Sequence, residues 1–449
     1  MYKKVVLLFF GLLPLVGFTQ QKWTLNRCIL YSINNNLDVK NAEYSEEIAK
    51  ISYSQSKWSY LPNVYAGSSS GMQFGRSVDP STYQILKNTS YFTNSSYLEA
   101  TLDLFNGFSQ INKQLYQRFL LLSAQNSNQR LEDETAFSVM NAYYNVIYYE
   151  KLLSIAVEQE QLSKLNLKKT EAMVAAGLKS QADLLEIRAN VAKDELFHIQ
   201  TQNQVEAAKL NLRKAMNLTM DSTLDVDNKI DSIFIINSTD VNGAELFTKF
   251  SSTSPQLNSL EYTWKASLKD ISVRKAGYYP SLQLSASCGT GYYETLKDTN
   301  GVTYSFNNQY NKNLSNYVGV SISIPIFSRN EVRFRVKQAK LISEQNKNAY
   351  DKAKQNLQFE ILENVNALIA ASKEFEQLKE QQKADEMAFD AAQKKYNKGM
   401  LSVVDLFSAK NRLGLTEANL LKARLTLEVR KRNIDFYKGV RFWESSSIN

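Results

Sequence analysis

Two aspartates in matching motifs have the clearest capacity for chemistry in this chain. Asp183 and Asp405 each end the pattern Gly-x-x-Ser-x-x-Asp, at residues 177–183 and 399–405. A carboxylate just after a glycine turn can satisfy free backbone N–H groups at the start of the next helix, which is a structural role. If several such turns converge on one axis, the carboxylates instead form a charged ring that favours cations. The sequence alone leaves both interpretations open.

Residues for catalysis or metal binding are not grouped elsewhere. The single histidine, His198, has no neighbouring pattern of His, Cys or carboxylates with the spacing of a metal site. The chain contains no phosphate-binding glycine loop and no nucleophile elbow. We therefore expect no enzyme, bound metal or cofactor, and we interpret His198 as a solvated helix residue.

The spacing around the two motifs indicates a duplication. Phe105 and Phe327 each end an alternating apolar stretch and lie 222 residues apart, and the two motif glycines have the same separation. No glycine or proline interrupts 108–176 or 328–398. Each segment is therefore predicted to be one helix, roughly 100 Å long at 1.5 Å per residue. Because neither copy of the segment contains an insertion, we predict that the length of the helix matters for the function.

Further helices are predicted on both sides of these long ones. Return helices follow the motif glycines, over about 178–218 and 400–438, and shorter helices are expected over 24–59 and 255–276. A narrow apolar stripe with charged residues between its members is typical of helix-on-helix seams rather than of a large core.

Each copy also contains a pair of alternating strands, within 62–105 and 280–327. The strands are about 10 to 13 residues long, close to the length of a tilted strand that spans a bilayer. Polar loops are expected near 75–90 and 293–310. A soluble sandwich with one wet face is the alternative, but four strands offer no second sheet to pack on. The residues predicted to face lipid are Leu98, Leu102, Val320, Ile322 and Ile324.

The first twenty residues have the pattern of a secretory signal peptide. Lys3 and Lys4 precede an apolar stretch over 5–18, and small residues suit cleavage near Gln20. A transmembrane anchor is the alternative, but it needs roughly 20 apolar residues. The division of the chain is thus predicted as a signal peptide 1–20, a first repeat 21–220, a linker 221–250 that could form a short strand or two, a second repeat 251–440 and a tail 441–449.

Composition argues against other classes of protein. The formal net charge of +8 is dispersed, and no basic block with interleaved aromatic residues predicts a nucleic-acid surface. Cys28 and Cys288 lie in different halves and are expected to be unpaired thiols.

Four membrane strands cannot close a barrel, and open sheet edges are not tolerated in lipid. Two copies would give eight strands and a filled bore, whereas three copies give twelve strands and a lumen. The fold class is therefore predicted as a mixed α and β membrane protein. A trimeric twelve-stranded outer-membrane β-barrel would continue as a periplasmic α-helical barrel built from the tandem repeat.

These features resemble the TolC-like outer-membrane efflux channels over nearly the whole mature chain. The resemblance rests on Tyr- and Pro-containing strand entries at 60–62 and 278–280, strand exits at 104–107 and 326–328, and the two glycine motifs. It implies a homotrimer whose periplasmic end is closed by the hairpin tips, with Asp183, Asp405, Tyr396 and Ser408 at the constriction. It also implies that a periplasmic adaptor docks on the tips, at Gly177, Leu178, Ser180, Leu184, Gly399, Met400, Ser402 and Leu406.

Two positions depart from the family pattern. Ser408 stands where the best-known members carry a second acidic residue, and Leu401 replaces the basic residue expected after the second glycine. The resemblance therefore implies a closed-state lock that differs in detail.

The predicted function is a passive exit duct in the outer membrane of a Gram-negative bacterium, in a tripartite efflux or type I secretion system. The implied partners are the adaptor, outer-membrane lipid and an inner-membrane pump of the resistance-nodulation-division, ABC or major-facilitator type. A secreted periplasmic coiled-coil scaffold, or an adaptor without a pore, is the alternative.

Overall fold

The computed structural model describes residues 22–78, 83–220, 224–228 and 241–444. It confirms the mixed α and β composition, with long helices and one antiparallel sheet. The chain forms two compact units, and each combines segments from both sequence halves. Unit 1 comprises residues up to 40, 131–250 and 358 onward, and unit 2 comprises 41–130 and 251–357. The predicted signal peptide lies outside the described residues.

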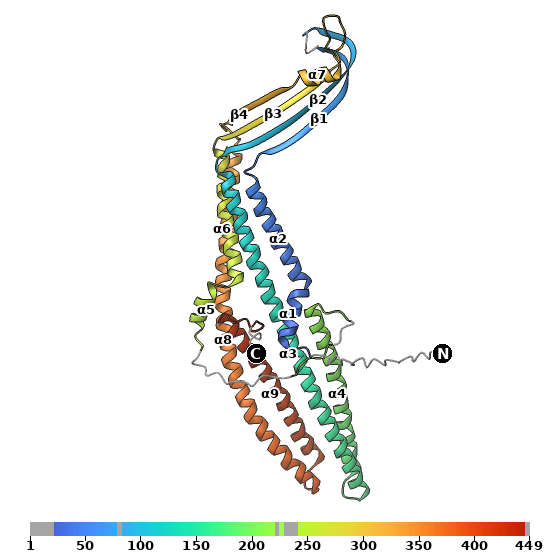
Figure 1. Cartoon of the computed structure of the whole chain (residues 1–449). Helices are drawn as coiled ribbons and strands as arrows, with labels where there is room; N and C mark the ends of the chain where they lie inside the picture. The colour runs from blue at the N-terminus through green and yellow to red at the C-terminus, as the bar shows by residue number, and fades with distance from the viewer. Residues whose placement is uncertain (1–21, 79–82, 221–223, 229–240, 445–449) are drawn as a thin grey trace, which may run out of the picture. The chain divides into compact units, whose positions relative to one another are not determined.

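The sheet of unit 2 has the strand order β1-β2-β3-β4, so β1 and β4 are its two edges (Figure 1). All neighbouring strands are antiparallel. Because side chains alternate between faces, the pairing register assigns each residue to one side of the sheet. The strands are β1 (Asn63–Val78), β2 (Ile85–Asn106), β3 (Ser281–Tyr293) and β4 (Ser315–Ser323).

The register places the apolar positions of all four strands on one face. Leu102 pairs with Leu284, and Leu284 pairs with Val320 on its other side. Other rows of the same face join Leu98 to Cys288 and Leu282 to Ile322. Leu98, Val320 and Ile322 are more than half exposed in the single chain, and Leu102 is partly exposed. The opposite face carries Ser, Thr, Gly and Tyr together with Glu99 and Asp103.

Several strand predictions need correction. β1 and β2 have 16 and 22 residues and occupy much of the loop predicted over 75–90, because their polar outer parts continue the ladder as backbone pairs. β4 ends at Ser323, so Ile324 lies one residue beyond the strand. A register shift between Asp103 and Phe105 leaves Leu104 without a partner on β3. The second predicted loop contains a short helix, α7 (Phe306–Lys312).

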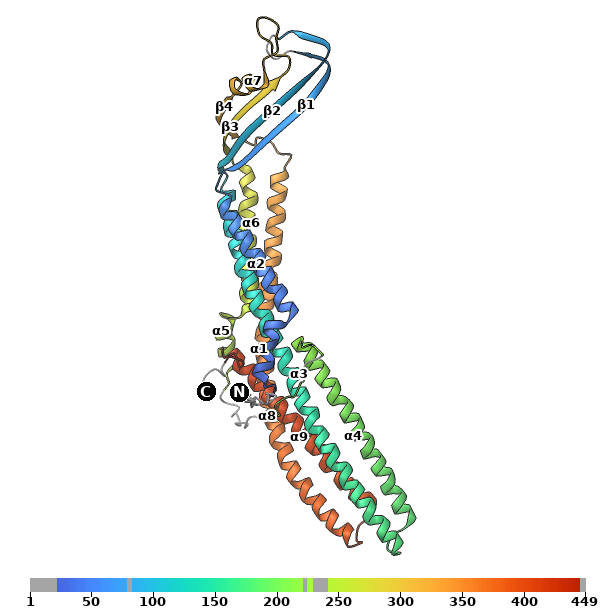
Figure 2. The same ribbon diagram turned by 45° about the vertical axis from the view of Figure 1, so that its right-hand side comes forward.

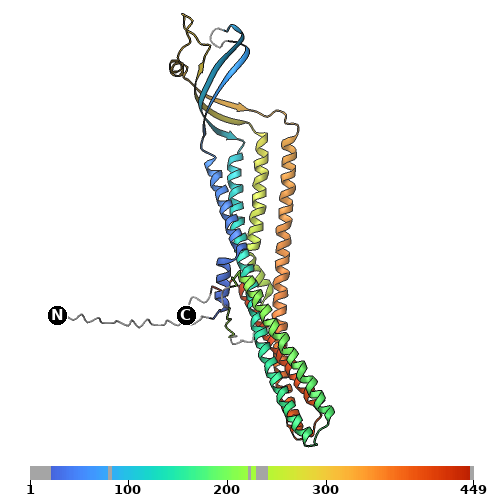
Figure 3. The ribbon, with the colours of Figure 1, turned by 90° about the vertical axis from the view of Figure 1, so that its right-hand side faces the viewer.

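Four helices lie side by side in unit 2, in the order α2, α3, α6, α8 (Figure 3). Asn128 on α3 donates to Glu46 on α2, Ser123 on α3 contacts Ser259 on α6, and the Trp264 ring of α6 stacks on Tyr350 of α8. The helices α2 and α8 are therefore the edges of this layer. Their bounds are α2 (Leu37–Trp58), α3 (Ser109–Ala175), α6 (Pro255–Lys275) and α8 (Glu331–Asn397), with a 3-10 turn after α6 at Ala276–Tyr278.

The two long helices have equal length, because α3 and α8 each contain 67 residues. The return helices are α4 (Gln181–Met216) and α9 (Val403–Tyr437), with 36 and 35 residues. Within unit 1, α4 follows α3 and α9 follows α8 as helical hairpins (Figure 2). No helix in the described part of the chain is both long and apolar enough to cross a membrane.

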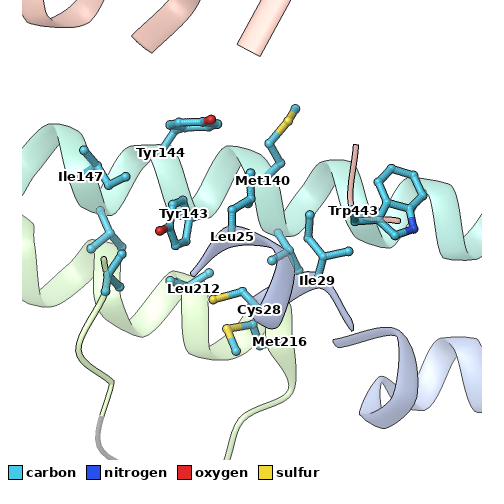
Figure 4. Packing of buried hydrophobic residues seen from close by; sticks show 14 of the residues in the cluster. Leu25, Cys28, Ile29, Met140, Tyr143, Tyr144, Ile147, Leu212, Met216 and Trp443 are labelled. Atoms are coloured by element: carbon cyan, nitrogen blue, oxygen red, sulfur yellow. The ribbon is translucent and has the colours of Figure 1, made fainter. Parts of the chain in front are cut away.

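The largest core of unit 1 joins α1 (Leu25–Asn35) to α3 and α4. Leu25, Cys28 and Ile29 of α1 are buried against residues such as Tyr143 of α3 and Leu212 of α4 (Figure 4). Cys28 is a free thiol whose pKa burial raises to about 12, and Cys288 is also free. Trp443, in the predicted tail, is buried in the same core.

The first short helix and the linker differ from prediction. Asn36 adopts an extended conformation and divides the segment predicted as one helix into α1 and α2. The Asn36 side chain accepts a hydrogen bond from the backbone N–H of Asp38, as a cap of α2. In the linker, Val226 forms one parallel bridge with Trp23, and α5 (Gly243–Ser251) is a helix that the sequence reading missed. The apolar segment 233–236 lies outside the described residues.

Candidate gate at the hairpin tips

The two tip turns have the same backbone geometry. Gly177 and Gly399 adopt the left-handed conformation, with φ of 71° and 73°. Glycine accepts this conformation without steric cost, so it ends the long helix and lets the chain reverse. Ser180 and Ser402 then cap the return helices, because each hydroxyl accepts a hydrogen bond from the backbone N–H three residues later.

The two candidate gate aspartates are the third residues of their helices rather than the caps. Asp183 completes a capping box by accepting from the backbone N–H and the hydroxyl of Ser180. These bonds hold the pKa of Asp183 below its usual range. Asp405 accepts from the Ser402 hydroxyl at 2.7 Å and is exposed. Ser408, three residues further on, is also exposed.

Tyr396 is fully buried and joins the two tips. Its hydroxyl shares a hydrogen bond of 2.6 Å with Thr170 of α3, and burial raises its pKa. Lys179 from the first tip donates to the Leu401 carbonyl at 3.2 Å, and its ammonium lies 5.2 Å from the centre of the Tyr396 ring. Lys179 is the repeat equivalent of Leu401, because these residues are also 222 apart. The basic residue absent from the second tip is thus present in the first, a signal that the sequence reading did not use.

Apolar residues of the tips divide into a buried and an exposed set. Leu184 and Leu406 are buried, so their side chains serve the packing of the tips and are not available as a docking surface, contrary to prediction. Leu178 and Met400 directly follow the two glycines and are 74% and 73% exposed. The buried cluster of this region contains Ile187, Val191, Tyr396, Val403, Leu406 and Phe407.

A buried ion pair that the sequence reading missed lies further along the same helices. Lys410 of α9 is only 3% exposed, and its ammonium donates to Asp194 of α4 and, at 2.6 Å, to the Ser163 hydroxyl of α3. Ser163 in turn donates to Asp194 at 2.5 Å. The three groups satisfy one another, as buried charges require. Burial lowers the pKa of Lys410.

The histidine lies in a different setting. His198 of α4 pairs with Glu160 of α3 at 2.5 Å, and Lys164 pairs with the same carboxylate. His198 therefore contacts a carboxylate of an interhelical ion-pair network, in which Lys164 of α3 also pairs with Glu195 of α4, and is not an isolated surface residue. Within the described residues, no group of three or more His, Cys, Asp or Glu side chains is placed to hold a metal ion.

Comparison with known proteins decides the family. The sequence profile of the family described as outer membrane efflux protein matches residues 31–218 and 248–439, most of the chain. The chain belongs to the outer membrane efflux protein family.

Relatives and solved structures agree with this membership. The probable efflux pump outer membrane protein TtgC of Pseudomonas putida is 21% identical over 426 residues, covering 92% of this chain and 83% of TtgC. The CmeC outer membrane channel of Campylobacter jejuni superposes with a TM-score of 0.80 at 14% identity, covering 92% of this chain and 85% of CmeC. The outer membrane protein VceC of Vibrio cholerae gives 0.77 at 15% identity, covering 91% and 95%.

These matches give the outer membrane efflux protein the fold of known outer-membrane channels. They lend no support to the secreted scaffold or the pore-free adaptor.

Proposed function

We propose that this outer membrane efflux protein is a passive exit duct that carries substrates across the periplasm and the outer membrane. The observation that carries the proposal is the sheet of unit 2, with one apolar face, one polar face and two unpaired edge strands. In lipid the apolar face contacts hydrocarbon, and the polar face lines an aqueous lumen. The substrate enters at the hairpin tips and leaves through the barrel.

We propose that three copies close the barrel. Edge strand β4 of one copy pairs with β1 of the next, a head-to-tail contact that forms a ring when repeated. Three copies give twelve strands and a lumen, whereas two give a bore filled by side chains. The edge helices support this assembly. Tyr44, Ile51 and Trp58 on α2, and Phe334 and Leu341 on α8, are spaced seven residues apart and are 60–66% exposed in the single chain, a pattern typical of an uncovered helix seam.

Cysteine crosslinking tests this assembly. Cysteines at Ile51 or Trp58 of α2, combined with cysteines at Phe334 or Leu341 of α8, should produce covalent species that end at three chains in mild detergent. The background carries Cys28→Ser and Cys288→Ser. As a control, Ser123→Cys with Ser259→Cys should link within one chain, because these residues already touch. Covalent species that end at two chains for every α2–α8 pair would contradict the trimer.

The proposed gate consists of the tips, with Asp183 and Asp405 near the constriction and the Tyr396–Thr170 contact, together with Lys179, holding it closed. Up to six carboxylates in a trimer would favour cations at the entrance. Asp405→Asn should therefore reduce the preference for K⁺ over Cl⁻ in single-channel recordings, and low pH should do the same to the unchanged protein. Asn keeps the oxygen that accepts from Ser402, so helix capping is retained. Unchanged ion selectivity would assign Asp405 a purely structural role.

The proposed partners are a periplasmic adaptor, which contacts Leu178 and Met400, and an inner-membrane pump that supplies the energy. Both residues occupy the same position of their repeats, so a trimer offers six similar apolar contact points. Leu178→Glu with Met400→Glu should abolish efflux in cells without altering the conductance of the purified channel. Met387→Glu, at a 70% exposed position on α8 away from the tips, is the matched control and should leave efflux intact.

A further inference from the structure

The polar face of the sheet carries a distinctive set of charges. The basic residues of the strands, Arg76 of β1 and Lys87 of β2, lie in the outer parts near the connecting loop. Over the rest of the strands, at 63–75, 91–106, 281–293 and 315–323, there is no lysine or arginine, and Glu99 and Asp103 are the only acidic residues. Both lie on the polar face of β2. Glu99 has no ion-pair partner among the residues that the structure describes. Carboxylates that have no ion-pair partner and no basic residue in their part of the sheet attract cations.

Tyrosines surround only one of these two carboxylates. Tyr65 pairs with Glu99 across β1 and β2, and Tyr97 lies two residues before Glu99 on the same strand and face. The Tyr65 and Tyr97 rings meet edge to face, with centres 6.2 Å apart. In the same row, Ser287 separates Glu99 from Tyr317 on β4. By contrast, Asp103 pairs with Gln283, whose amide donates to it at 3.3 Å.

Two glycines let the tyrosine rings lie across the sheet. A Cβ atom on Gly67 would meet the end of the Tyr97 ring at 2.7 Å, and one on Gly319 would meet the Tyr317 hydroxyl at 2.2 Å. Any larger residue in place of either glycine would fill the space that the ring occupies. The Tyr97 ring thus lies over the backbone of Gly67, and the Tyr317 ring over that of Gly319. Tyr97 and Tyr317 remain 43% and 61% exposed. Between them, Ser287 and Gly289 of β3 form a floor of small residues.

We infer that Tyr65, Tyr97, Tyr317 and Glu99 form a binding site for organic cations, such as quaternary ammonium groups, on the polar face of the sheet. Tyrosine rings attract a cation through their quadrupoles, and the carboxylate supplies the opposite charge. A quaternary ammonium fits this chemistry better than K⁺ because it is weakly hydrated and covers a wide area of the rings. The inference rests on the proposed duct, in which this face lines the lumen.

Block of the channel current tests this site. Full-length protein in a planar bilayer is bathed in K⁺, and choline is compared with its uncharged isostere, 3,3-dimethylbutan-1-ol. Choline should reduce the K⁺ current and the isostere should not. Tyr97→Leu should weaken the block by about two- to fivefold, the size of an exposed cation–π contact. Glu99→Gln should also weaken the block, because it removes the charge opposite to that of the cation. Tyr97→Phe retains the ring and should keep the block.

The matched control is Asp103→Asn, which removes a carboxylate from the same strand and face but has no tyrosine beside it. It should leave the choline block unchanged. If Asp103→Asn and Glu99→Gln weakened the block equally, the block would arise from the overall negative charge of the lumen and not from a specific site, which would overturn the inference. So would an unaltered block in Tyr97→Leu. If no K⁺ current appears even in a Tyr396→Phe variant, which lacks the hydroxyl of the proposed lock, the duct itself is wrong, so the two failures are distinguishable.

Discussion

At the scale of single residues, the buried Lys410–Asp194–Ser163 group is a costly feature of unit 1. Two charges have been removed from water, and their mutual attraction compensates only when the geometry is good. Nonpolar side chains of similar volume can replace such pairs without loss of stability. We interpret the retained charges as a device that fixes how α9 aligns with α3 and α4, since an alternative alignment would leave both charges unpaired.

A double substitution separates this role from simple stabilisation. Lys410→Met or Asp194→Leu alone should destabilise the protein by about 3–5 kcal/mol, because each leaves one buried charge without its partner. The combined Lys410→Met and Asp194→Leu variant should recover most of that loss. Thermal unfolding in detergent measures all three. A double variant no more stable than the single ones would show that the pair contributes net stability.

We expect Asp133 to make the stability of unit 1 depend on pH. It is buried beside Arg441, and burial raises its pKa to about 7, against the opposing effect of Arg441. Because the folded state holds this proton more tightly than the unfolded state, its contribution is fully present below pH 4 and is lost as pH rises through 7. The melting temperature should therefore be higher at pH 5 than at pH 8. Asp133→Asn should remove most of that difference, and an unchanged pH dependence would exclude Asp133 as its source.

At the scale of elements, the sequence predicted what depends on local chemistry. The lengths of α3 and α8 follow from tracts without glycine or proline, and the tip turns follow from Gly177 and Gly399. The break at Asn36 has a weaker marker, a run of three asparagines at 34–36, which are preferred N-cap residues and which the prediction of one helix did not use. The outer parts of β1 and β2 lack a clear alternation of apolar and polar residues, because their strand conformation is fixed by backbone pairing and not by a side-chain pattern. Lys410 and Asp194 lie 216 residues apart, and only the packing of the two hairpins brings them together.

The equal lengths of α3 and α8 lead to a prediction about the tips. Removing four residues from α3 between 120 and 170 would shift its tip by roughly 6 Å relative to that of α8. The Thr170–Tyr396 and Lys179–Leu401 contacts would then be lost. Export in cells should stop, while the protein still reaches the outer membrane. The equivalent deletion made in both helices should be less harmful because the tips stay level. Normal export after the single deletion would show that helix length is not critical.

At the scale of the whole molecule, the assignment of faces decides whether the chain can form a duct at all. Ile322 and Ser321 are adjacent on β4 and lie on opposite faces, paired with Leu282 and Gln283 respectively. If the apolar face contacts lipid, Ile322→Lys places a charge in hydrocarbon and should destabilise the protein, by less than the roughly 2–4 kcal/mol of a midplane position because Ile322 lies near the end of β4. Ser321→Lys would point into water and should be tolerated.

Folding into vesicles, followed by denaturant titration, measures the two costs on the same strand. Because the residues are neighbours, effects of strand propensity and depth in the membrane largely cancel. Equal destabilisation would mean that neither face is aqueous, as in a sheet packed between two protein layers. Greater damage at Ser321 would reverse the faces and would place Glu99 and Asp103 against lipid. Only the predicted order, with Ile322→Lys the more costly, is compatible with a lumen lined by the polar face.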